Sequence, residues 1–340
     1  MKKQLILSFI LFVSALSLCA QEKDPQKLHS TAKNFMRSGD MGNAIIVLRR
    51  GLELNPGNLE MLKDLAYAQF LNKDYASAQK TAQPLTDRKD ADVACYQILA
   101  MIYRSLDEKK ESEKLYRSGM KRFPSSGVLF NEYGELLWDR EEPAEAIKYW
   151  EKGIAADPNY PSNYYHAARY YFFSTEKLWG LLYGEIFINL ESYTQRTVEI
   201  KKLLLDGYKK LFSGSALLKD EPAKNPFTQA VLSLYQQQSP QMNQGLSIET
   251  ITVLQTRFIL EWFTKFSGKY PYRLFDHQRQ LLKLGLFDAY LQWIYGPVVS
   301  LTAFEEWTKS HATEYQDFLR LQQNRLFKIP AGQYYKSLTK

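Results

Sequence analysis

Residues able to do acid–base, nucleophilic or metal chemistry are few and scattered in this sequence. None of its four histidines lies within three to five residues of another or of Cys95; they are His29, His166, His277 and His311. Paired metal-ligand spacings, a glycine-rich phosphate loop and a nucleophile elbow do not occur. The sequence therefore predicts no metal site, no cofactor and no catalytic residue, and we expect that the protein is not an enzyme.

Two carboxylates come nearest to a catalytic group. Asp276 precedes His277, but adjacent residues of a helix point about 100° apart and would not share a hydrogen bond. Glu185 interrupts an apolar run, where a buried charge needs a partner. We expect a structural ion pair between Glu185 and Arg196, with a catalytic Glu185 as the alternative.

The N-terminal segment 1–20 has the features of a secretory signal peptide. Lys2 and Lys3 precede an apolar run that is too short to span a bilayer, and small residues lead to a predicted cleavage site after Ala20. Lipid attachment at Cys19 is the alternative to soluble export, although bulky Leu18 stands where lipoprotein signals have a small residue. A buried first helix is a further alternative. We expect export to the periplasm or cell envelope.

Cleavage after Ala20 would leave one cysteine and a modest charge. The formal net charge of +7 falls to +5 and is spread along the chain without a dense basic run, which is poor support for nucleic-acid binding. Cys95 has no partner for an intramolecular disulfide. Because it falls inside a predicted helix, we expect a buried thiol, with a reactive thiol as the alternative.

The elements that would position a functional surface recur with a regular period, of about 34 residues, from Pro25 to Pro158. Its eighth and twentieth positions hold small side chains, where two crossing helices approach closely. These residues are Ala32, Ala66, Ala100 and Gly134 at the eighth position, and Ala44, Ala78, Ser112 and Ala146 at the twentieth. The period predicts helix hairpins over 25–58, 59–92, 93–126 and 127–160, with Pro84 shortening the second helix of the second hairpin.

This pattern resembles the tetratricopeptide repeat (TPR) family, and the signal with repeats and a helical tail resembles exported TPR proteins of Bacteroidetes-type bacteria. The resemblance implies an α-solenoid whose first helices line a concave groove. Its groove positions correspond here to Lys33, Arg37, Tyr67, Phe70, Met101, Arg104, Asn131, Trp138, Tyr165, Arg169 and Phe172. Further groove positions fall on His29, Lys63, Gln97 and Glu135.

The predicted groove mixes aromatic rings with basic side chains. Such a surface suits a peptide with acidic groups, because rings bury apolar side chains and guanidinium groups hold carboxylates. His29 and Lys33 stand where chaperone-binding members of the family have lysine and asparagine, so a chaperone-tail reader is not expected. The alternative is that several of these rings pack inside the superhelix.

A fifth, degenerate repeat is expected over 161–192, in which Gly180 and Gly184 would admit close packing by another element. Residues 193–340 are predicted to form a helical C-terminal domain, and 33 of the 48 aromatic residues lie from Tyr160 onward. Helices are expected over 194–212, 227–238, 247–266, 272–284, 286–295 and 302–326, with breaks at Gly296-Pro297 and near His311. The rings would fill a core that caps the solenoid, or line an apolar ligand pocket as the alternative.

The sequence thus predicts an all-α protein, a TPR solenoid over 25–192 followed by the helical domain. We expect an exported scaffold or adaptor that binds a protein or peptide partner in a cell-envelope assembly. Outer-membrane association would come through that partner or through Cys19. The alternatives are an enzyme, or a polyanion- or glycan-binding protein, that uses the C-terminal domain.

Overall fold

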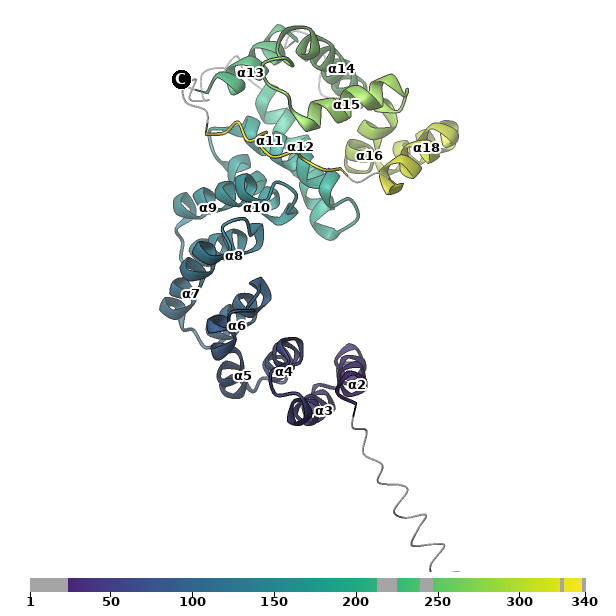
Figure 1. Cartoon of the computed structure of the whole chain (residues 1–340). Coiled ribbons are helices and arrows are strands. Elements are labelled where there is room, and N and C mark those ends of the chain that lie inside the picture. Colours follow the sequence, from purple (N-terminus) through teal and green to yellow (C-terminus); the bar gives the residue numbers. More distant parts are fainter. Residues whose placement is uncertain (1–23, 213–224, 239–246, 325–326, 338–340) are drawn as a thin grey trace, which may run out of the picture. The chain divides into compact units, whose positions relative to one another are not determined.

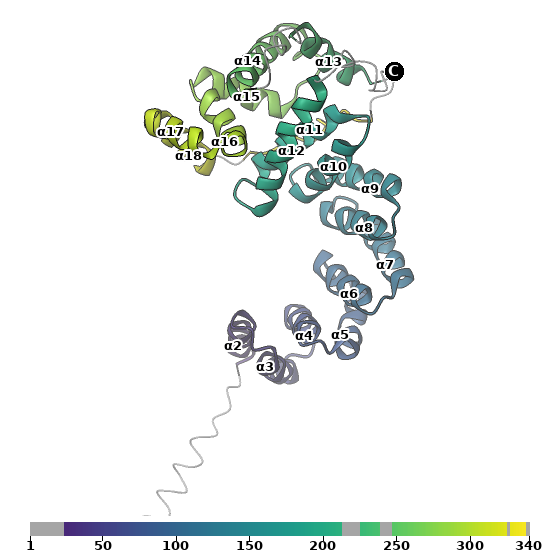
Figure 2. The same cartoon turned by 180° about the vertical axis from the view of Figure 1, so that it is seen from behind.

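The computed structural model describes residues 24–212, 225–238, 247–324 and 327–337, and every regular element within these ranges is a helix (Figures 1 and 2). The all-α prediction is therefore confirmed. The chain divides into two compact units that meet between Phe123 and Pro124. We call the part up to Phe123 unit 1 and the part from Pro124 unit 2, and each is described by itself. This division falls inside the predicted solenoid, whereas the sequence pattern changes near residue 192. The predicted signal peptide and Cys19 lie outside the described residues.

Unit 1 consists of three helix hairpins whose first helices begin one period apart, at Pro25, Leu59 and Val93. Its elements are α2 (Pro25–Arg37), α3 (Met41–Leu54), α4 (Leu59–Leu71), α5 (Tyr75–Ala82), the 3₁₀ helix η1 (Gln83–Asp87), α6 (Val93–Ser105) and α7 (Lys109–Arg122). Five of these helices start at an Asp or Asn whose side chain accepts a hydrogen bond from a backbone N–H of the first turn. Pro84 shortens the second hairpin as expected, because α5 ends at Ala82 and continues as η1.

The small residues of the period lie where the helices of each hairpin cross. Ala32 and Ala44 are fully buried in one apolar cluster of unit 1, and Ala66 and Ala78 are fully buried in another. Ser112 is also fully buried. The prediction that small side chains permit close crossing is therefore confirmed for these hairpins.

The turn inside each hairpin repeats as well. The fifteenth residue of the period has a positive φ in four successive hairpins, at Gly39, Lys73, Asp107 and Glu141. Only the first is a glycine, so three L-residues occupy the left-handed region at a conformational cost. The recurrence at one position shows that the hairpin geometry imposes this turn on different side chains.

Unit 2 begins with two more hairpins and continues into a helical bundle. Its helices are α8 (Gly127–Asp139), α9 (Pro143–Ala156), α10 (Pro161–Phe173), α11 (Lys177–Leu190), α12 (Gln195–Phe212), α13 (Pro226–Gln238), α14 (Ile248–Lys265), α15 (Arg273–Lys283), α16 (Phe287–Val299), α17 (Leu301–Ser310) and α18 (Ala312–Asn324). The predicted break near His311 separates α17 from α18.

Helix α12 keeps the period of the repeats. It begins one full period after α10 and packs against both α10 and α11, as the first helix of a sixth hairpin would. The two glycines of α11 make this packing close. Gly180 lies against the backbone of Phe172, and Gly184 lies against Ile200 and Leu204 of α12. The expectation that these glycines admit another element is confirmed for Gly184, whereas Gly180 meets α10 of its own hairpin.

Aromatic rings fill the interior of the bundle, as predicted. Trp262 and Phe275 are buried and their ring centroids lie 4.8 Å apart, and Phe227 and Phe258 belong to the same cluster. Trp293 is buried elsewhere in the bundle. Phe263, Phe266, Phe304 and Trp307, expected in this core, are only half-buried.

The predicted helix break at Gly296-Pro297 is wrong. Helix α16 runs through Pro297 to Val299, although proline removes the N–H that would bond the carbonyl of Trp293 four residues earlier. Lys201 of α12 supplies a replacement donor, with its Nζ 2.6 Å from that carbonyl oxygen and 3.6 Å from the Trp293 ring centroid. The carbonyl is therefore satisfied, and the helix need not end before the proline.

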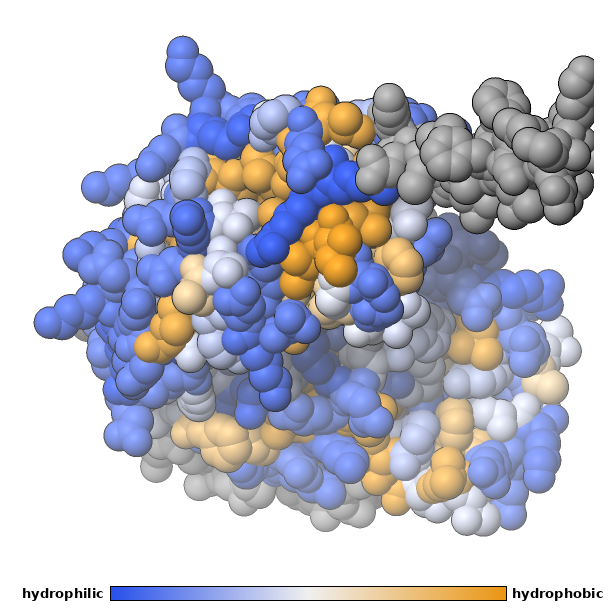
Figure 3. Space-filling view, turned by 90° about the horizontal axis from the view of Figure 1, so that it is seen from below, coloured by the Kyte–Doolittle hydropathy of each residue, from blue (hydrophilic) through white to orange (hydrophobic). Residues whose placement is uncertain are grey.

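Exposed apolar side chains occur as separate patches. In unit 1 the large ones are Ile46, Leu54, Tyr67 and Leu71. Figure 3 shows patches of hydrophobic residues set between hydrophilic ones on the face seen from below. Scattered apolar residues of this kind are normal on a protein surface, so exposure alone does not identify a binding site.

Candidate partner-binding surface

The groove positions of unit 1 lie on its first helices α2, α4 and α6. Lys33, Arg37, Tyr67 and Arg104 have exposed side chains, whereas Phe70 and Met101 are half-buried. Tyr67 stacks on Phe70 at a centroid distance of 6.4 Å, and Phe70 packs against the apolar cluster that contains Ala66 and Leu99. Phe70 is thus a support for Tyr67, whose ring is 37% exposed.

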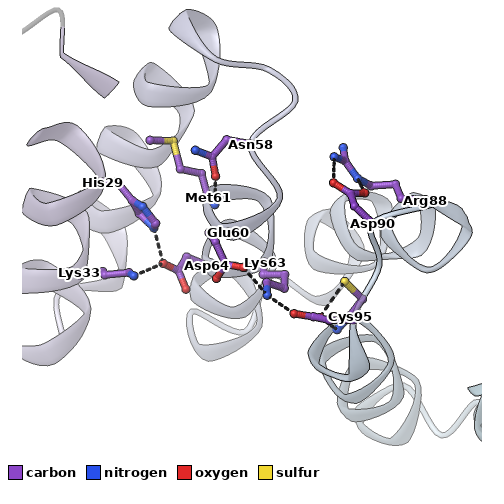
Figure 4. A network of polar contacts seen from close by, with 11 residues as sticks. His29, Lys33, Asn58, Glu60, Met61, Lys63, Asp64, Arg88, Asp90 and Cys95 are labelled. Atoms are coloured by element: carbon purple, nitrogen blue, oxygen red, sulfur yellow. Dashed lines mark hydrogen bonds and ion pairs between the residues drawn. The ribbon is translucent and has the colours of Figure 1, made fainter. Parts of the chain in front are cut away.

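A single carboxylate holds two of the groove side chains of α2 (Figure 4). Asp64 of α4 lies 2.7 Å from His29 Nε2 and 3.9 Å from Lys33 Nζ, measured to its Oδ2. His29 is largely covered, whereas about half of the Lys33 side chain stays accessible. The bond fixes α2 against α4 and leaves Lys33 facing solvent.

Lys63 of α4 joins this helix to the start of α6, the first helix of the next hairpin (Figure 4). It is buried, and its Nζ donates to Asp92 at 2.6 Å and lies 2.7 Å from Glu60. Burial alone would lower the pKa of Lys63, but its bonds to Asp92 and Glu60 raise that pKa above its ordinary value. Asp92 also caps α6 by accepting from the Cys95 N–H. Lys63 is therefore committed to packing between repeats.

Cys95 lies beside that cap and is fully buried. Its Sγ donates to Asp92 Oδ1 at 3.4 Å, and burial raises the pKa of the thiol. Raising the pKa disfavours the reactive thiolate form. The expectation of a buried, structural thiol is confirmed.

Arginines close the turn after η1, where Asp90 takes the position of the period that Pro56, Pro124 and Pro158 hold in other hairpins. Arg88 makes two hydrogen bonds of 2.8 Å to Asp90 and donates to the Gly57 carbonyl at 2.9 Å. Arg122 donates to the carbonyls of Thr86 and Arg88. Bidentate guanidinium bonds can thus replace the rigidity of a proline at this turn.

In unit 2 the groove positions of α8 are mostly built into the repeat. Asn131 is buried, donates to Glu135 at 2.8 Å, and its carbonyl accepts from Trp150 at 3.2 Å. Glu135 also bonds His166 of α10 at 3.0 Å. Trp138 is the exception on α8, since 45% of its surface is exposed.

Helix α12 covers the groove positions of α10. The Tyr165 hydroxyl donates to Glu199 at 2.6 Å, and Arg169 lies 3.0 Å from the same carboxylate. Burial and the bond to Glu199 raise the pKa of Tyr165 to about 12. Lys210 Nζ lies 3.9 Å from the ring centroid of Phe172. All three positions therefore contact α12, although only Tyr165 is buried and 42% of the Arg169 side chain stays exposed.

The predicted ion pair between Glu185 and Arg196 is wrong. Arg196 pairs with Glu191, its Nε lying 2.9 Å from Glu191 Oε1. Glu185 is 3% exposed and accepts from the Tyr290 hydroxyl at 2.9 Å and from Gln278 Nε2 at 2.5 Å. Burial raises the pKa of Glu185 to about 7, although these two bonds lower it. An enclosed carboxyl of this kind cannot reach a substrate from solvent.

The sequence analysis missed the role of Glu199, which bonds the groove residues Tyr165 and Arg169 of the fifth repeat. Its position could have been found from the period, because Gln195 stands one full period after Pro161. Within the described ranges no cluster of three potential metal ligands occurs. None of the helices described is both long and apolar enough to cross a membrane.

Part of the repeat array is similar to tetratricopeptide repeats. A family model described as tetratricopeptide repeat matches residues 35–102, and helix hairpins with the predicted period extend from α2 to α11. A search of curated proteins finds no match.

Solved structures of TPR proteins resemble the chain at low sequence identity. TTC0263, a thermophilic TPR protein of Thermus thermophilus, is 16% identical over 54% of this chain and 100% of its own, with a TM-score of 0.43. PilF of Pseudomonas aeruginosa is 16% identical over 56% and 93%, with a TM-score of 0.46. YrrB, a TPR protein with an unusual peptide-binding site, is 14% identical over 56% and 97%, with a TM-score of 0.37.

Proposed function

We propose that this protein is an interaction scaffold that binds an acidic peptide segment of a partner protein through unit 1. The observation that carries the proposal is the accessibility of Lys33, Arg37, Tyr67 and Arg104 on α2, α4 and α6. Three exposed cations and a supported aromatic ring on these first helices suit carboxylates interspersed with apolar side chains. The equivalent Tyr165 and Arg169 of α10 are bonded to Glu199 of α12, so they support such a role less.

We propose further that the protein is exported and acts in the cell envelope, without catalytic activity of its own. The basic residues and apolar run at the start of the sequence support export. The N-terminal residue of the protein isolated from its native cells tests this directly. Cleavage after Ala20 would leave Gln21 first, lipidation would leave a modified Cys19 first, and an intact Met1 would contradict export.

The partner-binding proposal is tested with an array of acidic peptides that also carry apolar residues. Binding is measured by fluorescence anisotropy for the wild type and for the double variant Arg37→Glu and Arg104→Glu. We expect the best peptide to lose at least tenfold in affinity, because two attractive charges become repulsive. Tyr67→Ala should weaken binding separately by removing the exposed ring.

A matched control carries the same change of charge elsewhere in unit 1. Lys110→Glu and Lys121→Glu lie on α7 with exposed side chains, away from the groove positions. This control should bind as the wild type does, apart from a small long-range effect that added salt removes. Equal losses in both double variants would mean that only net charge matters, and the proposed surface would then be wrong.

A further inference from the structure

The last described segment of the chain, residues 327–337, runs over unit 2 without joining a helix or a sheet (Figure 1). Among the described residues, no backbone–backbone hydrogen bond links it to the rest of unit 2. Phe327, Ile329 and Tyr335 are nevertheless 8%, 6% and 9% exposed. Side chains of the surrounding helices and turns therefore hold it, in the way that a protein holds a bound peptide.

The side-chain amide of Asn159 binds the backbone of the segment at one residue. Asn159 lies in the turn between α9 and α10, donates from Nδ2 to the Ile329 carbonyl at 3.1 Å, and accepts from the Ile329 N–H at 2.8 Å. Both polar groups of one peptide residue are thus satisfied by one side chain. This contact depends on an extended backbone and does not involve the side chain of residue 329.

Two further positions bind the backbone in the same manner. Asn225, just before α13, donates to the carbonyls of Tyr335 at 2.6 Å and Lys336 at 3.1 Å. Arg273, the first residue of α15, donates from Nε to the Lys328 carbonyl at 3.1 Å. The contacts with Asn159, Arg273 and Asn225 therefore reach from one end of the segment to the other.

Selective contacts accompany these backbone contacts. The Tyr335 ring stacks on Phe227 at a centroid distance of 4.8 Å, and its hydroxyl donates to the Pro271 carbonyl at 2.7 Å. Lys336 Nζ lies 2.6 Å from Glu176 in the turn between α10 and α11. An aromatic pocket next to an acidic residue selects an aromatic side chain followed by a basic one.

We propose that this surface of unit 2 is a binding site for an extended peptide, and that the chain's own C-terminal segment is its exchangeable occupant. The site is made by the turns on either side of α10 together with the starts of α13 and α15. It goes beyond the proposed function, because it lies in unit 2 and takes a peptide with apolar, aromatic and basic residues. The surface of unit 1 would instead take an acidic peptide.

The experiment uses the full chain with a protease recognition sequence inserted between Asn324 and Phe327. After cleavage of the folded protein, a fluorescent synthetic peptide of residues 327–340 is added, and its binding is followed by anisotropy. We expect the cleaved protein to keep its helical circular dichroism while the labelled peptide replaces the original segment. A peptide with the same residues in scrambled order should not bind.

Asn159→Ala tests the backbone contact in the same cleaved protein. Losing two hydrogen bonds to Ile329 should weaken peptide binding by about tenfold or more. The matched control is Ser125→Ala, at the same position of the preceding turn of the period, and it should bind the peptide as the parent does. If the uncleaved chain forms dimers that Asn159→Ala abolishes, the segment of a second copy occupies the same site, which also supports the proposal.

Three results would overturn the proposal. Loss of helical signal on cleavage would show that the segment is an integral part of the core. A cleaved protein that stays folded but never takes up the labelled peptide would show that the segment does not exchange. Equal affinity of the parent and Asn159→Ala would show that the peptide adheres without using the site.

Discussion

The same repeat positions serve different purposes in the two units. In unit 1 the groove positions of α2 leave Lys33 and Arg37 exposed. In unit 2 the corresponding Tyr165 and Arg169 of α10 are tied to Glu199 of α12. Repeat register therefore predicts where a side chain lies on its helix, but accessibility depends on the element packed against that helix.

The units also differ in the partners of their buried charged side chains. In unit 1 the buried Lys63 is paired with the opposite charges of Asp92 and Glu60. In unit 2 Glu185 and Lys201 are buried and bonded to uncharged groups. Burial without a counter-ion disfavours the charged form, so we expect the pH dependence of stability to come mainly from unit 2.

Glu185→Gln should give the largest effect and would sharpen this contrast. Burial raises the pKa of Glu185 from 4.5 to about 7, so its favourable contribution is fully present below pH 4.5 and is lost as the pH rises through about 7. This shift in pKa corresponds to a loss of about 3 kcal/mol in the free energy of unfolding across that pH range. We expect the wild type to lose stability from pH 5 to pH 7, and the variant to lose much less, in urea unfolding.

The titration of Lys201 changes the free energy of unfolding mainly at higher pH. Burial lowers the pKa of Lys201 from 10.5 to about 7, so its contribution is present above pH 10.5 and is lost as the pH falls through about 7. Most of that change lies above the window in which Glu185 titrates. Equal slopes for the wild type and Glu185→Gln between pH 5 and pH 7 would show that the buried carboxyl is not the source of the pH dependence.

Much of the fold could be predicted because its causes are local. The period from Ala32 to Gly134 fixes where helices cross, and Pro84 shortens its own helix through its ring. The aromatic core was likewise predictable from helical spacing, as Trp262 and Phe275 show. Each of these inferences needs only residues near one another in the chain.

The wrong and missing parts depend on distant residues. Glu185 finds Gln278 and Tyr290, which are 93 and 105 residues away, in place of the nearby Arg196. The helix continues through Pro297 because Lys201 bonds a carbonyl 92 residues further along the chain. No local pattern in the sequence indicates which of several helices will supply such a partner.

The surface of unit 2 that binds residues 327–337 was missed for the same reason. Asn159 contacts Ile329 across 170 residues, and an asparagine in a turn is ordinary in sequence. In unit 1 the exposure of Lys33 and Tyr67 follows from helix position, and their role in binding stays a prediction. In unit 2 helix position did not predict the accessibility of Tyr165, because α12 continues the period as a further helix and packs against it.

The smallest expected effects compare the carboxylates that bond groove positions in the two units. Glu199→Ala removes the acceptor of the buried Tyr165 hydroxyl and should cost about 1–2 kcal/mol in the free energy of unfolding. Asp64→Ala removes the bond to the largely covered His29 and the half-exposed pair with Lys33, and should cost about 1 kcal/mol. Urea unfolding followed by circular dichroism measures both.

The two losses also respond differently to salt. Added salt should shrink the share of the Asp64→Ala effect that comes from the ion pair with Lys33, because a partly exposed ion pair is screened. It should change the Glu199→Ala effect less, because only the Arg169 pair is screened and the lost hydrogen bond from Tyr165 is not. Glu306→Ala, an exposed carboxylate of α17, controls for loss of charge. If Asp64→Ala proved the costlier change, the carboxylate of unit 1 would be the stronger packing element, and the contrast between open and covered groove positions would fail.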